Sequence, residues 1–156
     1  MFNRKKYEQD AVNLYRSTNA AILSTMSKKY EGYPFGSFIT YATDKSRTLF
    51  MYTSDIAQHT KNLKNDSKAC VTLFKLDTEY DKQNSSRLTL MGDLKKVPKD
   101  DLDDCQERFV KFLPESKKYS SMHDFKFYKL EISRVRWIGG FGDICLLYTS
   151  DAADES

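Results

Sequence analysis

The arrangement of short apolar segments along this chain of 156 residues constrains its fold more than any other sequence feature. Apolar or alternating segments predict strands over residues 20–26, 34–43, 48–53, 68–74, 86–94 and 124–135, with another starting at residue 137. Most neighbouring segments are joined by connections of hairpin length, whereas a parallel sheet needs a long crossover between each pair of strands. The order therefore predicts an antiparallel barrel with helices at its ends.

Two helices and one bulge complete the predicted framework. Residues 5–17 carry apolar side chains on one helical face, and Pro98 opens a second amphipathic helix that ends at Pro114. Gly92 interrupts an alternating strand and predicts a β-bulge. The aromatic side chains of Tyr128 and Trp137 are predicted to belong to the barrel or dimer core.

Residues 49–63 contain the strongest local indication of function. An apolar strand stops at Thr53 and Ser54 and continues into a short helix that carries His59 and Lys61 in its opening turns. Ser54 is a natural N-cap for that helix. Backbone donors, hydroxyl groups and cationic side chains would converge there, as they do where a protein holds a phosphate group.

Composition bounds the class of protein. A chain of this length that is 40% hydrophobic suffices for one compact core, and its net charge of +3 gives little support to nucleic-acid binding. No apolar run resembles a membrane span or a signal peptide, so a cytoplasmic protein without a membrane partner is expected. Cys70, Cys105 and Cys145 lie far apart without metal-ligand spacing, so reduced thiols and no metal site are expected.

The last residues differ in character from the rest of the chain. Residues 145–155 closely resemble the translation of a sequencing adapter, and they end in small and acidic residues. We therefore expect the authentic domain to comprise residues 1–144, truncated at its C-terminal side, and residues 145–156 to be a non-native tail.

Several short motifs occur along the chain in a characteristic order. They are Ile22-Leu23-Ser24-Thr25, Gly32-x-Pro34-x-x-Ser37, Ser54-x-x-x-x-His59-x-x-Asn62-Leu63, Arg87-Leu88-Thr89-Leu90-x-Gly92, Arg108-Phe109 with Pro114, Asp124-Phe125 and Gly139-Gly140-Phe141-Gly142. Together they resemble the flavin-binding split barrels related to pyridoxamine 5′-phosphate oxidase. The similarity extends from about Ala11 to Gly142.

This resemblance implies a six-stranded antiparallel split β-barrel that works as a homodimer and holds FMN in clefts at the subunit interface. By the same resemblance, the FMN phosphate would lie at Ser37, Tyr52, Thr53 and the turn of Gln58 and His59. Arg87 would reach the cofactor from its own strand. The other residues that the resemblance assigns to the cofactor site are Phe38, Ser54 and Asn62.

Two positions favour one branch of this family. The oxidase proper carries an arginine where Ser37 stands and a lysine where His59 stands, and the haem-utilisation branch of the HugZ and HutZ type shares both replacements. In that branch the residues at His59 and Asp124 lie near the haem or flavin cleft, which makes both of them candidate catalytic residues. An axial histidine comes there from a C-terminal tail.

Three functions are consistent with these residues. The first is an FMN-dependent oxidoreductase acting on a small molecule. The second is haem binding and oxidative breakdown, in which the protein supplies a shielded cleft while iron and a reductant activate oxygen. The third is a non-catalytic dimer that binds or stores a cofactor, which no pairing of nucleophile and base in the sequence excludes.

Overall fold

The structure is a computed structural model, and it describes residues 3–140 and 144–149. The helices and strands follow one another as α1 (Arg4–Ser17), β1 (Ala20–Met26), β2 (Pro34–Thr40), β3 (Ala42–Thr43), β4 (Leu49–Ser54), α2 (Gln58–Asn65), β5 (Lys68–Lys75), β6 (Ser86–Lys96), α3 (Leu102–Phe112), β7 (Phe125–Ile138) and β8 (Ile144–Thr149). Short 3₁₀ turns lie over Lys82–Asn84, Lys99–Asp101 and Pro114–Tyr119.

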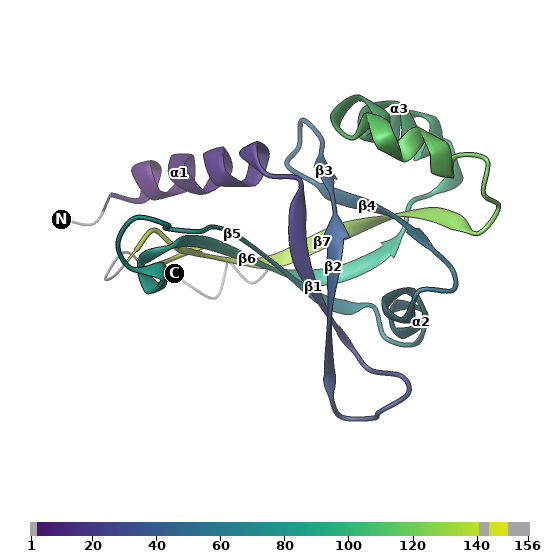
Figure 1. Cartoon of the computed structure of the whole chain (residues 1–156), viewed down its shortest axis with the longest axis horizontal. Helices are drawn as coiled ribbons and strands as arrows, with labels where there is room; N and C mark the ends of the chain where they lie inside the picture. The colour runs from purple at the N-terminus through teal and green to yellow at the C-terminus, as the bar shows by residue number, and fades with distance from the viewer. Residues whose placement is uncertain (1–2, 141–143, 150–156) are drawn as a thin grey trace.

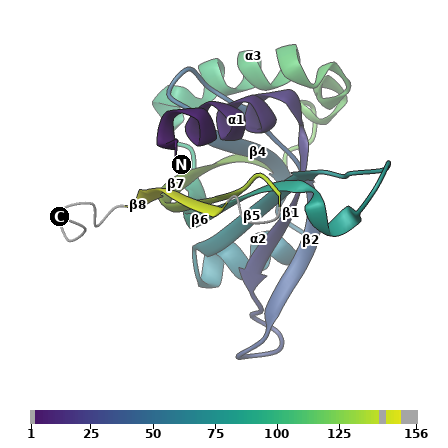
Figure 2. The same cartoon turned by 90° about the vertical axis from the view of Figure 1, so that its left-hand side faces the viewer.

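All described strands belong to one antiparallel sheet. Its order is β2-β1-β5-β6-β7-β4-β3, and β8 pairs with the C-terminal part of β7, while β4 pairs with the N-terminal part. The sheet curls so that β2 comes into contact with β4, and the hairpin of β1 and β2 extends away from α1 and α3 (Figures 1 and 2). The six longer central strands confirm the predicted antiparallel split barrel.

Alternation along the strands separates an inward face from an outward face. Leu23, Val71 and Leu90 are buried on the inner side, whereas their sequence neighbours on the same strands point outward. Tyr128 and Trp137 both lie in this main core, as the sequence predicts. Because a strand exposes successive side chains on opposite faces, the outward set forms a second continuous surface.

A bulge lets the longest pair of strands keep apolar residues on the inner side. Met91 pairs with Arg134 but Gly92 pairs with Ile132, so Ser133 is an extra residue on β7. The inward residues of β7 therefore change from Val135 and Trp137 to Leu130 and Tyr128 across this point. The predicted irregularity at Gly92 is confirmed, and the additional residue lies on the opposite strand.

The three helices cover different parts of the sheet (Figure 1). Helix α1 begins at the cap residue Asn3 and packs on β5 and β6, α2 packs on β1 and β2, and α3 packs on β3 and β7. Beneath α3, a smaller aromatic core forms around Phe50, Phe109 and Phe127. Within residues 3–140 and 144–149, no helix has both the length and the apolar character needed to span a bilayer.

Three expected boundaries differ in the structure. The strand expected over residues 34–43 is divided at Tyr41, whose hydroxyl donates to the Tyr15 carbonyl at 2.8 Å and fixes α1 there. The helix expected from Pro98 begins at Leu102, after a 3₁₀ turn. Trp137 does not start a new strand, because its pairing with Leu88 continues β7.

The C-terminal expectations remain partly untested. Residues 144–149 form β8 on β7, while the sequence sets residues 145–156 apart as a non-native tail. That assignment and the domain boundary at residue 144 stay predictions. The Phe141 and Gly142 positions of the glycine-rich motif lie outside the described residues.

We expect Gly92→Ala to destabilise the fold by about 2–4 kcal/mol, because the added methyl group would overlap the backbone carbonyl of Glu131. Gly36→Ala on β2 is the matched control, since a methyl group there meets no atom within 4 Å. Urea unfolding followed by circular dichroism measures both free energies of unfolding. Equal stability of the two variants would contradict a tight bulge.

Candidate functional site

The turn between β4 and α2 is built differently from the sequence prediction. Helix α2 begins at Gln58, its cap residue is Ala57, and no side chain caps it. The predicted N-cap role of Ser54 is therefore wrong. The Ser54 hydroxyl instead accepts a hydrogen bond from the Ile56 amide at 3.2 Å and donates to the Asp124 carboxylate, so it stabilises the turn before the helix.

Thr53 holds the candidate residue His59. The Thr53 hydroxyl lies 2.7 Å from His59 Nε2 and 3.2 Å from the Thr60 hydroxyl, and both threonines are buried. Burial lowers the pKa of His59 below its ordinary value, so the neutral ring is favoured. When Thr53 donates to Nε2, the single ring proton is on Nδ1, which can donate to an anionic ligand.

Asn62 anchors α2 to the barrel. It is fully buried, its Nδ2 donates to the Thr25 hydroxyl at 3.0 Å, and its Oδ1 accepts from the Lys28 amide at 3.0 Å and from Gln58 Nε2 at 3.1 Å. Its oxygen and nitrogen are thus both engaged within the protein. Asn62 and Gln58 orient the helix that carries His59, and Gln58, which is half-buried, is the one nearer to solvent.

Asp124 ties the start of β7 to the same turn. Its backbone carbonyl accepts from the Asp55 amide at 2.8 Å, in addition to the carboxylate contact with Ser54. The Lys64 ammonium, 3.1 Å from Asp55, holds the pKa of that carboxyl below its usual value. Asp124 therefore lies close to the predicted phosphate turn, where its carboxylate accepts a hydrogen bond from the Ser54 hydroxyl.

Tyr52 is directed away from the turn and into an aromatic layer. Its ring stacks on Phe127 with centroids 4.1 Å apart, and its hydroxyl donates to the Tyr119 carbonyl at 3.3 Å. The side chain of Tyr52 thus belongs to the region under α3, while Thr53 faces the interior of the barrel. Of the two, the structure gives only the Thr53 hydroxyl a direct contact with His59.

The two predicted residues of β2 face opposite sides of the sheet. Ser37 pairs with Leu23 on the inner side, and its hydroxyl donates to the Leu23 carbonyl at 3.4 Å. Phe38 pairs with Ile22 on the outer side and is 68% exposed. A single ligand on one face of the sheet would therefore contact only one of these two side chains.

Arg87 lies far from the β4–α2 turn within one chain. Tyr52 pairs with Phe127 and Arg87 pairs with Ile138, so eleven residues of β7 separate the two positions. At about 3.3 Å per residue this is roughly 35 Å along the strand. The Arg87 Nη2 group donates to the Gln83 carbonyl at 2.7 Å, whereas its buried Nε has no hydrogen-bond partner among the described residues.

An exposed apolar surface surrounds Arg87, and sequence reasoning missed it. Paired positions place Phe38, Ile22, Thr72, Thr89 and Arg136 in one outward row across five strands. The adjacent rows contain Cys70, Met91 and Arg134, and Phe74 and Arg87. We refer to the outward side chains Ile22, Phe38, Phe74, Arg87, Met91, Arg134 and Arg136 as the outer band. The available signal was the apolar residues at solvent-facing positions of β1 and β5.

Comparison with known proteins finds one matching family profile and a related protein whose name refers to heme. The profile of the family described as "CREG, beta-barrel" matches residues 3–152. The non-canonical heme oxygenase HOZ of Arabidopsis thaliana chloroplasts is 34% identical over 119 residues, which are 76% of this chain and 36% of that protein. The chain thus spans little more than a third of that relative.

Solved structures agree on the fold. A heme binding protein from Mycobacterium smegmatis superposes with a TM-score of 0.81 at 27% identity, covering 97% of this chain and 60% of that one. HutZ, the heme storage protein of Vibrio cholerae, superposes with a TM-score of 0.69 at 20% identity, covering 83% and 92%. The second likeness concerns the fold alone.

We expect His59 to make folding stability dependent on pH. Because the folded pKa of His59 lies below the ordinary value of about 6.5, the unfolded chain binds a proton that the folded chain does not. The contribution is complete above about pH 6.5 and declines as the pH falls through the folded pKa. Urea unfolding at several pH values should show this decline in the wild type and less of it in His59→Gln.

His123→Gln is the matched control, because His123 is exposed and is the only other histidine of the chain. This variant should keep the wild-type decline. An unchanged decline in His59→Gln would refute the role of His59 burial.

Proposed function

Because this chain belongs to the CREG β-barrel family, which has the split-barrel fold of pyridoxamine 5′-phosphate oxidase-like proteins, we propose that it binds haem between two copies of itself. The names of its relatives support haem as the ligand, since they include a heme oxygenase and a heme binding protein. One feature of the chain's own residues also supports haem as the ligand.

This feature is the buried Nε of Arg87, which has no hydrogen-bond partner among the described residues. An unsatisfied buried donor costs free energy, so a shift of the Arg87 side chain that brings its guanidinium group to a planar anion such as a carboxylate would be favoured. Arg134 and Arg136 lie on the same face of the sheet as Arg87. The outward side chains between Arg87 and these two arginines, Thr89 and Met91, are small or apolar. The outer band thus suits a flat apolar ligand that carries two carboxylates, as haem does.

The second copy is needed to bring the predicted site residues together. The resemblance assigns Arg87 and His59 to one cofactor, yet they are far apart on one chain. They can serve one ligand only if two copies contribute. The exposed apolar side chains of the outer band, from 40% for Ile22 to 68% for Phe38, provide a surface for such an association.

Oxidative breakdown of haem is the more specific form of this proposal. Haem, when bound, would supply the iron that binds and activates oxygen. The chain would contribute an apolar surface that excludes water, arginines that orient the carboxylates, and the neutral ring of His59 as a hydrogen-bond donor. In the tautomer in which Thr53 donates to Nε2, Nδ1 carries the proton and has no lone pair for iron, so we assign His59 to hydrogen bonding.

FMN is the second candidate, and the β4–α2 turn favours it. The Nδ1 donor of His59 and the adjacent hydroxyl groups suit a phosphate group. The positions of Ser37 and His59 provide no fixed positive charge, so we expect FMN to bind less tightly than haem. A protein that binds either cofactor without converting it would fulfil the storage function.

We expect purified protein to bind haem with a Soret band at micromolar concentration, and Arg87→Gln to weaken that affinity about tenfold or more. Arg16→Gln is the matched control, because Arg16 also donates to a backbone carbonyl but lies on α1. Parallel titration with FMN, followed by flavin fluorescence, compares the two cofactors. Absence of a Soret band in the wild type would refute the proposal, and ascorbate-driven loss of the band would extend it to breakdown.

We expect the chain to be a dimer in solution, and Phe74→Lys to weaken the dimer about tenfold or more by placing a charge beside Arg87 in an apolar interface. Phe112→Lys is the matched control, since both phenylalanines are 49% exposed but Phe112 lies on α3. Analytical ultracentrifugation measures both dissociation constants. A monomeric wild type, or equal weakening by both substitutions, would show that the outer band is not the interface.

A further inference from the structure

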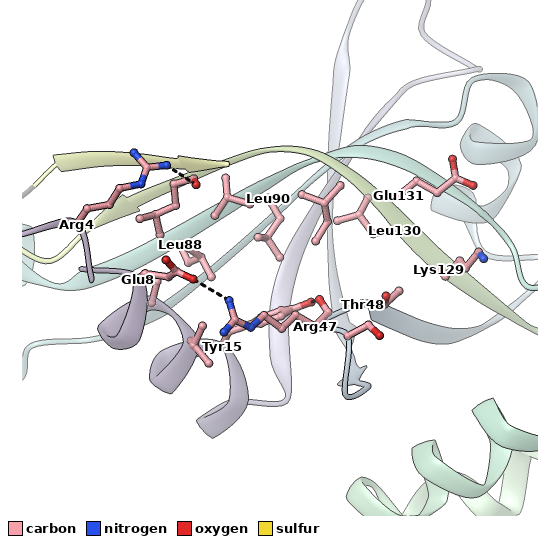
Figure 3. A pocket seen from close by; sticks show the side chains of 16 residues that line it. Arg4, Glu8, Tyr15, Arg47, Thr48, Leu88, Leu90, Lys129, Leu130 and Glu131 are labelled. Carbon is pink, nitrogen blue, oxygen red and sulfur yellow. Dashed lines mark hydrogen bonds and ion pairs between the residues drawn. The ribbon is translucent and has the colours of Figure 1, made fainter. Parts of the chain in front are cut away.

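A cavity of about 570 Å³ lies on the inner side of the sheet, between α1 and strands β6 and β7. Leu88, Leu90 and Leu130 form its apolar floor (Figure 3). Ala11 and Val12 of α1 also line the cavity. Leu147 of β8 also borders it, and its carbonyl holds Arg4 in place, so this edge of the cavity depends on β8. The volume is in the range of small-molecule sites, about 300–1,000 Å³. This cavity and the outer band lie on opposite faces of the sheet.

Charged side chains surround this apolar cavity, and their balance favours an anion. Arg47 pairs with Glu8 at 3.1 Å, so this acid at the cavity has a cationic partner, whereas Glu131 alternates with Leu130 and pairs with Lys95 on the other face of the sheet. Arg4 donates to the Leu147 carbonyl at 2.8 Å and makes no ion pair with the described residues, so among them its charge is uncompensated. The cavity thus carries an excess of positive charge.

Arg47 is held at the cavity in an unusual backbone conformation. Its φ of 65° makes it the only residue other than glycine with a positive φ in the described parts of the chain. The Tyr15 hydroxyl donates to the Arg47 carbonyl at 2.9 Å, and the Asp44 carboxylate accepts from the Ser46 and Thr48 amides at 2.8 and 2.9 Å. Burial raises the pKa of Tyr15, so this donor stays protonated. The turn therefore fixes a cation in place despite its backbone strain.

We propose that this cavity binds an amphipathic carboxylate, with its apolar body against Val12, Ile132 and Val135 and its carboxylate at Arg4 and Arg47. The ion pair with Glu8 is half-exposed, so a ligand carboxylate can compete for the Arg47 guanidinium at low cost. Burial of an apolar chain against the half-buried Val12, Ile132 and Val135 would supply most of the affinity, since Leu88 and Leu90 are already buried in the core. This inference does not depend on haem or FMN binding.

The test uses cis-parinaric acid, a fatty acid whose fluorescence rises in an apolar environment. We expect saturable binding of one molecule per chain at micromolar concentration. Arg47→Gly should weaken binding about fivefold or more while leaving the fold intact, because glycine adopts a positive φ without strain. Arg47→Lys should restore part of the affinity. Val12→Trp, which narrows the cavity from the helical side, should weaken binding about tenfold.

Displacement by hexadecanoate and hexadecanol separates the carboxylate from the apolar chain. We expect hexadecanoate to displace the probe more effectively in the wild type, and this advantage to disappear in Arg47→Gly. Thermal unfolding monitors the integrity of each variant. Unsaturable fluorescence, full affinity in both Arg47→Gly and Val12→Trp, or equal displacement by acid and alcohol in the wild type would each overturn the proposal.

Discussion

The fold depends on the bulge between β6 and β7, where Ser133 has no register partner and its hydroxyl donates to the Met91 carbonyl at 3.1 Å. Without this extra residue, the alternation of β7 would place either Trp137 or Tyr128 on the outer face, because the two lie an odd number of residues apart. The bulge resolves this conflict, and the backbone of Gly92 approaches β7 closely at the same point. The resulting twist helps the sheet to curl and to enclose a core with strands of unequal length.

The curled sheet gives its two faces different chemical characters. The inner face joins the main core, the cavity under α1 and, at one end, the hydroxyl groups of Thr53 and Thr60 beside His59. The outer face carries apolar side chains next to arginines, a combination that isolated domains seldom expose without a partner. Each strand therefore contributes to both surfaces at once. Because side chains alternate between the two faces, a substitution on one face leaves the side chains of the other face unchanged.

Much of this architecture could be predicted from the sequence, because strand alternation and helix periodicity are local properties. The strand at 49–53, the helix that carries His59 and the irregularity at Gly92 were all readable from neighbouring residues. The capping role of Ser54 was not, because the distant Asp124 competes for its hydroxyl. The separation of Arg87 from His59 was also hidden, since it arises from register among several strands. The order of motifs along one chain does not show whether two copies of the chain contribute residues to one site.

The wide separation of Arg87 and His59 within one chain has a genetic consequence. In a cleft made by two copies, each cofactor would take its arginine from one polypeptide and its histidine from the other. A chain defective only at Arg87 and a chain defective only at His59 could then form a mixed pair with one cleft fully intact and one doubly defective. Two alleles that each fail alone would complement each other. Such complementation would show that the interface between the two subunits passes through the cofactor site.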